Sequence, residues 1–179
     1  MSELIKLHDL YFQPFISAEA IRAQVDKMGR QISQKYRGQN PIFLGVLNGA
    51  FVFAADLIRA CAIDCDISFI KLSSYRGTQS SGEVATLIGL DVAVKNRPVI
   101  IIEDIIDSGK TLYTFLPELQ QLEPSSIELA AMLTKPEALE YPVDIHYSGF
   151  AIPDKFVVGY GLDYDGLGRN LPGIYQHKA

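Results

Sequence analysis

The chain has 179 residues, a length typical of a single domain, and we expect residues 1–179 to form one. Its 16 Lys and Arg residues stand against 21 Asp and Glu residues, which gives a formal net charge of −5. This acidic balance argues against a general nucleic-acid binder, which needs a basic surface to displace counterions from phosphates. It also argues against attachment to anionic lipid by charge alone.

The cysteines and the apolar stretches exclude further classes of protein. Cys61 and Cys65 are the only cysteines, and the three histidines lie far from them in the sequence. We therefore expect reduced thiols rather than a four-ligand zinc site. No N-terminal stretch has the order of a secretory signal peptide, and the longest apolar stretch, 41–55, is too short to span a bilayer as a helix. These features predict a cytoplasmic protein.

Strand and helix patterns alternate along the chain. Apolar residues at helical spacing predict a first helix from Ser17 to just before Gly38. The strands that we expect cover 42–47, 67–72, 84–90, 99–102, 127–133, 143–146 and 156–158, and further helices cover 50–59 and 110–122. The polar stretch 73–82 predicts a long mobile loop, and the C-terminal tail is expected to be irregular. The alternation indicates an α/β fold with a mainly parallel sheet covered on both faces, in which ligands bind at the carboxyl ends of the strands.

The segment 99–111 carries the strongest chemical signal. An apolar strand is followed by two adjacent carboxylates, Glu103 and Asp104, and then by Asp107 and the turn into a helix. Residues 108–111 would present backbone N–H groups at the start of that helix, where a phosphate binds readily. The segment therefore offers acceptors for hydroxyls or a metal at one end and donors for phosphate at the other, which suits a sugar phosphate.

Two other interpretations of this segment are open to test. In the first, Asp107 or Ser108 only caps the helix, and the two preceding acids are solvated. In the second, Ser-Gly-Lys-Thr at 108–111 is the end of a nucleotide-binding P-loop. The P-loop pattern requires a glycine five residues before Gly109, and that residue is Asp104, whose carboxylate would repel the phosphates. The P-loop interpretation is therefore excluded.

The order of residues in 99–111 resembles the phosphoribosyl-pyrophosphate (PRPP) binding motif of the type I phosphoribosyltransferases: an apolar strand, two acids, two apolar residues, Asp, a small polar residue, Gly, a variable residue and Thr. The run 152–164, Ile-Pro-Asp-Lys-Phe-Val-Val-Gly-Tyr-Gly-Leu-Asp-Tyr, is a second match. Over nearly its whole length the chain resembles the hypoxanthine and hypoxanthine-guanine phosphoribosyltransferases. The resemblance implies a twisted, mainly parallel sheet flanked by helices, a small hood subdomain from the N- and C-terminal segments, and a homodimer or homotetramer.

The resemblance also implies roles on the PRPP side of a site. Glu103 and Asp104 match the acids on the ribose hydroxyls, one of them often through Mg²⁺, and Asp107 matches the proposed general base near purine N7. The 5′-phosphate would be held by Ser108, Gly109, Lys110 and Thr111. Pyrophosphate would be met by Asn48, Gly49 and Arg169, with a second Mg²⁺ on Asp163. Asn48 departs from the basic or bulky residue common at its position, which leaves its backbone N–H as the contact. Without the resemblance, residues 47–50 would be read as a strand-to-helix turn.

A further set of residues matches the purine side and the cover of the family's site. Lys155 resembles the lysine that donates to purine O6, Phe156 the aromatic that stacks on the base, and Val157 the residue whose backbone meets the base edge. Lys135, 20 residues before Lys155, matches a second purine-facing lysine. Ser74 and Tyr75 resemble a pair on a mobile loop that closes over the site and excludes water. Taken alone, these residues would be an ordinary buried strand, two strand-end charges and a surface loop.

The resulting prediction is a purine-salvage transferase that converts hypoxanthine, guanine or both, with PRPP, to IMP or GMP and pyrophosphate, in a Mg²⁺-dependent reaction. Two alternatives are a nucleic-acid-binding regulator with the same fold and a xanthine-preferring enzyme. The candidate site holds four acids (Glu103, Asp104, Asp107, Asp163) and three bases (Lys135, Lys155, Arg169), so it is not net positive. Attraction for an anionic substrate must therefore come from backbone amides and Mg²⁺.

Overall fold

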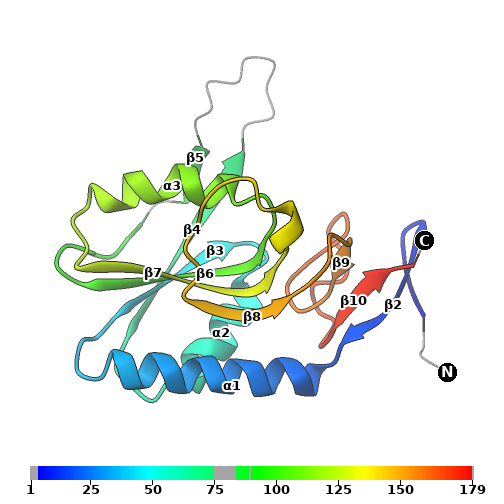
Figure 1. Cartoon of the computed structure of the whole chain (residues 1–179), viewed down its shortest axis with the longest axis horizontal. Helices are drawn as coiled ribbons and strands as arrows, with labels where there is room; N and C mark the ends of the chain where they lie inside the picture. The colour runs from blue at the N-terminus through cyan, green and yellow to red at the C-terminus, as the bar shows by residue number, and fades with distance from the viewer. Residues whose placement is uncertain (1–3, 75–83, 89, 179) are drawn as a thin grey trace.

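Two β-sheets and three α-helices make up the part of the chain that the computed structural model describes, residues 4–74, 84–88 and 90–178 (Figure 1). The larger sheet has the strand order β5-β4-β3-β6-β7-β8 and the smaller one β1-β2-β10-β9. The strands are β1 (Ile5–Leu7), β2 (Leu10–Ile16), β3 (Ile42–Leu47), β4 (Asp66–Ser74), β5 (Val84–Ile88), β6 (Pro98–Ile106), β7 (Ser126–Thr134), β8 (Tyr147–Ala151), β9 (Val157–Val158) and β10 (Ile174–His177). The helices are α1 (Ala18–Lys35), α2 (Phe51–Ala60) and α3 (Lys110–Gln120), with a 3₁₀ turn at Pro136–Ala138.

Helices cover both faces of the larger sheet, as the alternation of patterns predicts. Strands β4, β3, β6, β7 and β8 run parallel, and β5 adds an antiparallel edge. Helices α1 and α2 lie on one face and α3 on the other (Figure 1). Successive residues of β6 accordingly enter different cores: Ile100 and Ile102 pack with α1 and α2, whereas Val99 and Ile101 pack with α3. A strand buried on both sides needs a continuous apolar run, which is the pattern that β6 has.

Helix α1 forms where the periodic pattern predicts it. The Ser17 side chain caps the helix by accepting a hydrogen bond from the Ala20 N–H at 3.2 Å. The apolar stripe is buried, and Gly29 lies so close to α2 that a Cβ there would be 2.6 Å from the Ala60 carbonyl oxygen. The absence of a side chain at this crossing lets the two helices approach closely.

Three predicted boundaries are wrong, for reasons of strand pairing. The strand expected at 143–146 lies at β8 instead, because pairing with β7 starts where Tyr147 meets Ala130. The strand expected to stop at residue 102 continues to Ile106, since its later residues still pair with β7 after pairing with β3 has ended. The C-terminal tail is not irregular throughout, because β10 pairs with both β2 and β9.

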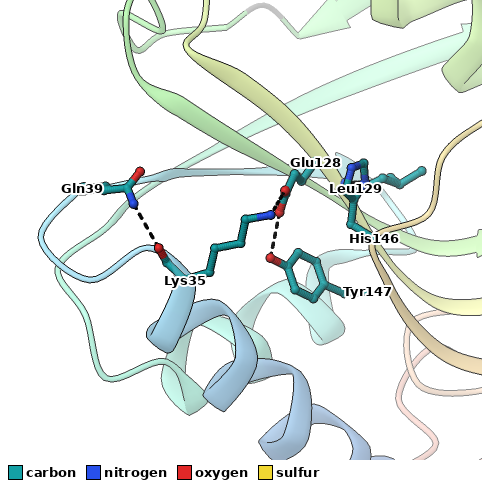
Figure 2. A network of polar contacts seen from close by, with 6 residues as sticks. All are labelled: Lys35, Gln39, Glu128, Leu129, His146 and Tyr147. Atoms are coloured by element: carbon teal, nitrogen blue, oxygen red, sulfur yellow. Dashed lines mark hydrogen bonds and ion pairs between the residues drawn. The ribbon is translucent and has the colours of Figure 1, made fainter.

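The end of α1 is tied to the sheet by a buried carboxylate on β7 (Figure 2). Glu128 is 8% exposed, accepts a hydrogen bond from the Tyr147 hydroxyl at 2.7 Å and forms an ion pair with Lys35. Burial alone would raise the pKa of Glu128, but the hydrogen bonds from Lys35 and Tyr147 outweigh it and lower the pKa. This network lies at the start of β7, away from the strand ends that bear the predicted site residues.

The smaller sheet combines the two ends of the chain, as the expected hood subdomain does. Strand β2 pairs with β1 from the N-terminal segment and with β10 from the C-terminal segment. The N- and C-terminal ends therefore lie on the same side of the molecule (Figure 1). In the described part of the chain, no helix has the length and apolarity needed to cross a membrane.

Candidate active site

The predicted site residues follow four neighbouring parallel strands of the larger sheet, at the edge where those strands end. Residues 48–50 follow β3, residues 107–109 follow β6, Lys135 follows β7 and residues 152–156 follow β8. Backbone hydrogen bonds join the segments that follow these strands. The Lys135 N–H donates to the Ile106 carbonyl at 2.9 Å, and the Ile152 N–H donates to the Thr134 carbonyl at 2.8 Å. This edge is where open α/β sheets bind ligands. Ser74 ends β4 beside them, and Tyr75 lies outside the described residues.

The two adjacent acids lie within β6 and are only partly exposed, so they are not fully solvated. Glu103 Oε2 is buried, and no hydrogen-bond partner for it occurs among the described residues. Burial raises the pKa of Glu103 well above its usual value, and neighbouring Asp104 raises it further. Burial likewise raises the pKa of Asp104 to about 6, although its Oδ1 accepts a hydrogen bond from the Ile105 N–H at 2.8 Å. Two half-buried carboxylates with raised pKa values at a ligand-binding edge indicate a site for hydroxyls or a cation.

Gly49 brings the turn after β3 onto the acidic pair. A Cβ at Gly49 would lie 1.4 Å from Asp104 Oδ2, so only glycine allows this approach. Gly161, from the segment between β9 and β10, packs in turn on Gly49, and a Cβ on it would lie 2.1 Å from the Gly49 carbonyl oxygen. The peptide bond between Leu47 and Asn48, just before Gly49, is cis, and the Asn48 side chain is exposed. Three segments far apart in the sequence therefore meet around two glycines.

Arg169 and Asp163 join the acidic pair from the same segment. Arg169 Nη2 lies 2.7 Å from Asp163 Oδ1, and its Nη1 donates to the Gly161 carbonyl at 2.7 Å. Asp163 Oδ2 also accepts a hydrogen bond from the Gly166 N–H at 2.7 Å. The Arg169 charge lowers and the Asp163 charge raises the pKa of Asp104, although burial remains the main cause of its raised value. The structure thus brings together five predicted site residues: Gly49, Glu103, Asp104, Asp163 and Arg169.

The turn into α3 forms a small concave site. Gly109 has a φ of +81° and is itself the N-terminal cap residue of α3, so neither Asp107 nor Ser108 occupies the cap position of the first alternative, although Ser108 Oγ accepts a hydrogen bond from the Lys110 N–H at 3.4 Å. The Ser108 carbonyl accepts hydrogen bonds from the N–H groups of residues 140 and 141, both at 3.0 Å, which fixes the turn. A cavity of about 100 Å³ is lined by Glu103 and residues 105–112. Backbone N–H groups at a helix start beside a cavity suit an anion.

A lysine bridges two acids on the next strand ends. Lys135 Nζ donates to Asp107 Oδ2 at 3.1 Å and to Asp154 Oδ1 at 3.0 Å, with the lysine side chain only 9% exposed. Burial alone would lower the pKa of Lys135, but the hydrogen bonds to Asp154 and Asp107 raise it. The pairing of Lys135 with Asp107 joins two residues that the sequence placed in one site. Asp154 was missed there, although it directly precedes Lys155.

An aromatic cluster from the smaller sheet holds the predicted stacking residue. Phe156 is 43% exposed, and its ring meets Phe12 at a centroid distance of 5.7 Å and Tyr164 at 5.6 Å, both in edge-to-face geometry. Val157 is buried in β9, and Lys155 is exposed at the turn before it. Phe12 lies on β2, a strand that the sequence patterns did not predict, so its part in this cluster was also missed.

The donor set around Asp104 fits a magnesium ion. Within residues 4–74, 84–88 and 90–178, no group of three or more His, Cys, Asp or Glu side chains surrounds a single point. Mg²⁺ usually takes one or two carboxylates from the protein and completes its shell with water and substrate phosphates, so it needs no such group. The unpartnered Glu103 Oε2 and the carboxylates of Asp104 and Asp163 are oxygen donors of the required kind.

Known proteins resemble this chain in sequence and in architecture. Residues 16–165 match the phosphoribosyl transferase domain family. The chain is 42% identical to the hypoxanthine-guanine phosphoribosyltransferase of Lactococcus lactis over 160 residues, which is 89% of this chain and 87% of that one. It is 43% identical to the hypoxanthine phosphoribosyltransferase of Buchnera aphidicola over 162 residues, 89% and 92% of the two chains.

A solved structure agrees with the sequence comparisons. The crystal structure of a hypoxanthine phosphoribosyltransferase from Staphylococcus aureus superposes with a TM-score of 0.88 at 38% identity, covering 93% of this chain and 91% of that one. The match extends over both sheets, because so little of either chain is left out. The chain therefore belongs to the phosphoribosyltransferases, in the branch of the hypoxanthine and hypoxanthine-guanine enzymes.

Proposed function

We propose that this enzyme transfers the phosphoribosyl group of PRPP to hypoxanthine, guanine or both, and forms IMP or GMP and pyrophosphate. The names of its relatives support the purine substrates. One observation carries the assignment to this site: the acidic pair Glu103 and Asp104, of which Asp104 touches Gly49, lies on β6 shortly before Asp107, whose carboxylate is held by Lys135 at 3.1 Å. One strand end thus offers groups for a ribose and for a purine.

The residues divide the reaction among them. The N–H groups of residues 108–111 hold the 5′-phosphate, and Glu103 and Asp104 accept hydrogen bonds from the ribose hydroxyls. N9 of the purine attacks C1′, the bond from C1′ to the pyrophosphate oxygen breaks, and the configuration at C1′ inverts. Asp107 accepts the proton that leaves N7, a step of the kind that contributes about 10²–10⁴-fold to a rate. Positioning and charge stabilisation supply the rest.

The purine is selected by hydrogen bonding to its 6-position. The Lys155 ammonium donates to O6 of a 6-oxopurine and has no acceptor to offer the amino group of adenine. Phe156 stacks on the ring, the backbone of Val157 meets its edge, and Lys135 faces it from β7. A site built to donate a hydrogen bond discriminates strongly against a ligand that lacks the acceptor.

Magnesium belongs to this proposal as a cofactor held by Asp163 and by Glu103 or Asp104. When bound, Mg²⁺ neutralises phosphate charge and polarises the departing pyrophosphate. Arg169 meets the pyrophosphate directly, and the Asn48 backbone N–H offers a neutral donor. Since burial raises the pKa of Asp104 to about 6, a cation beside it would favour the ionised form.

The test is a PRPP-dependent assay with hypoxanthine, guanine, xanthine and adenine as competing bases. We expect turnover of hypoxanthine, guanine or both, no turnover of adenine, and complete loss in excess chelator with recovery on addition of Mg²⁺. Preference for xanthine would favour the alternative specificity. Salt-sensitive binding of nucleic acid without release of pyrophosphate would favour the regulator. Unchanged turnover in excess chelator would refute the magnesium role.

The proposal extends to the setting of the enzyme. We place the enzyme in the cytoplasm, where purine salvage acts on soluble phosphates. The free thiols of Cys61 and Cys65 agree with this reducing compartment. Burial raises the pKa of Cys61 to about 11 and also raises that of Cys65, so both thiols stay protonated and unreactive near neutral pH. We expect a homodimer or homotetramer, which sedimentation equilibrium would distinguish from a monomer.

A further inference from the structure

Tyr160 lies in an unusual backbone segment beside the proposed pyrophosphate end of the site. Its φ is +50°, and it stands between Gly159 and Gly161, each with a φ of +99°. Positive φ is uncommon for a residue with a side chain, and it persists where the surroundings hold the residue in place. The segment between β9 and β10 lies between the two sheets (Figure 1).

A side-chain hydrogen bond supplies that restraint. The Tyr160 hydroxyl donates to Asp56 Oδ2 on α2 at 2.8 Å, and Tyr160 is 6% exposed. Its own N–H donates to the Leu171 carbonyl at 2.8 Å. Burial and the neighbouring Asp56 carboxylate both raise the pKa of Tyr160, so the hydroxyl keeps the proton that it donates.

The residue after Tyr160 connects this bond to the site. Gly161 packs on the Gly49 carbonyl, and its own carbonyl accepts the 2.7 Å hydrogen bond from Arg169 Nη1. Its N–H donates to the Arg169 carbonyl at 3.0 Å. Helix α2, which carries Asp56, begins two residues after Gly49. The Asp56–Tyr160 bond therefore links the turn that bears Gly49 to the segment that bears Arg169.

We infer that Tyr160 and Asp56 are positioning residues for PRPP and pyrophosphate: their hydrogen bond sets the distance between the Gly49 turn and Arg169. This inference rests on the proposed function. It assigns the bond to the phosphate-bearing substrates and not to the purine, because Lys135 contacts Asp107 and Asp154, and Phe156 contacts Phe12 and Tyr164, whereas the Asp56–Tyr160 bond connects to Gly49, Gly161 and Arg169.

Tyr160→Phe removes the hydroxyl and keeps the ring. We expect the KM for PRPP and, in the reverse direction, the KM for pyrophosphate to rise about tenfold, as loss of one hydrogen bond to a charged group implies. The KM for hypoxanthine should stay within about twofold of the wild-type value, because the substitution alters no contact to the purine. Asp56→Asn keeps an acceptor for the hydroxyl and should retain most of the PRPP affinity, whereas Asp56→Ala should reproduce the effect of Tyr160→Phe.

Tyr147→Phe is the matched control. It also removes a tyrosine hydroxyl that donates to a carboxylate, Glu128, at 2.7 Å, but at the start of β7 (Figure 2). We expect lower stability and unchanged KM values for this variant. If Tyr160→Phe folds poorly, Asp56→Ala tests the same bond from a side chain that is 40% exposed.

The outcomes are separable. A selective rise in the KM for PRPP and pyrophosphate in Tyr160→Phe or Asp56→Ala supports the inference. Unchanged KM values, an equal change for all substrates, or the same change in Tyr147→Phe overturns it. If the wild-type enzyme shows no PRPP-dependent turnover, the proposed function fails instead, and it fails before any variant is compared.

Discussion

The contact between Gly49 and Asp104 gives the sharpest prediction, because a single methyl group tests it. In Gly49→Ala the added Cβ would lie 1.4 Å from Asp104 Oδ2 and 2.4 Å from Cγ. Ordinary contact starts near 3.4 Å, so the carboxylate must move by about 2 Å. That movement breaks the 2.8 Å hydrogen bond from the Ile105 N–H. The acidic pair would then no longer present its oxygens at the strand end.

The expected effects differ for stability and for catalysis. Overpacking of this kind costs about 1–3 kcal/mol of unfolding free energy, which urea titration would measure. Misplacement of a substrate-positioning group by an ångström or more costs about 100-fold, so kcat/KM for PRPP should fall by about that factor. Steady-state kinetics with hypoxanthine held saturating would show it.

Gly38→Ala is the control for this experiment. Gly38 has a φ of +74° and nothing within 4 Å of an added Cβ, so the same substitution there strains the backbone without a steric clash. We expect a loss of about 1 kcal/mol in stability and no kinetic change. A folded Gly49→Ala enzyme with kcat/KM for PRPP within about threefold of the wild-type value would refute the reasoning.

Three further predictions follow from the same geometry. Asp107→Asn should lower kcat by about 10²–10³ and leave PRPP affinity nearly unchanged, and an unchanged kcat would remove Asp107 from the base role. Because burial raises the pKa of Asp104 to about 6, the folded protein binds a proton there more tightly than the unfolded chain, and stability falls as pH rises from about 4 to 6. Asp104→Asn should therefore have a higher free energy of unfolding than wild type at pH 7.5, by up to about 3 kcal/mol as measured by urea titration, while it loses activity. Equal or lower stability of the variant would contradict this. Phe12→Leu removes an edge-to-face partner of Phe156 and should raise the KM for hypoxanthine a few-fold with that for PRPP unchanged, whereas a change in both would point to general damage.

Local patterns predicted most of the larger sheet because its elements are buried on both faces. The run 99–102 and the stripe of α1 carry periodicities that follow directly from their burial. The error at 143–146 has the opposite cause: these residues are apolar in places, but the partner strand β7 selects Tyr147 as the first paired residue. Register between strands depends on the partner, and no single segment encodes it.

Of the smaller sheet, local patterns predicted only β9, and the rest followed from the family resemblance. Strands β1, β2 and β10 are short, and β10 lies more than 150 residues after β1 and β2 in the chain. Phe12 is completely buried there, yet it sits in a stretch with Pro14 and Gln13 that shows no clear alternation. Its part in holding Phe156 depends on a contact across most of the chain length, which local propensity does not report.

The site itself shows why its residues stood out in sequence while their contacts did not. Adjacent acids after an apolar run are visible as a local conflict, since a buried strand ordinarily excludes carboxylates. The structure keeps that conflict: burial raises the pKa of both Glu103 and Asp104, which costs the folded state stability at neutral pH. The contacts that hold the two acids in place cannot be predicted from the local sequence, because Gly49, Gly161 and Tyr160 come from two distant segments of the chain. A cation and a sugar phosphate that bind there would offset the cost, so the destabilised acidic pair is the part of the fold that substrate binding is best able to stabilise.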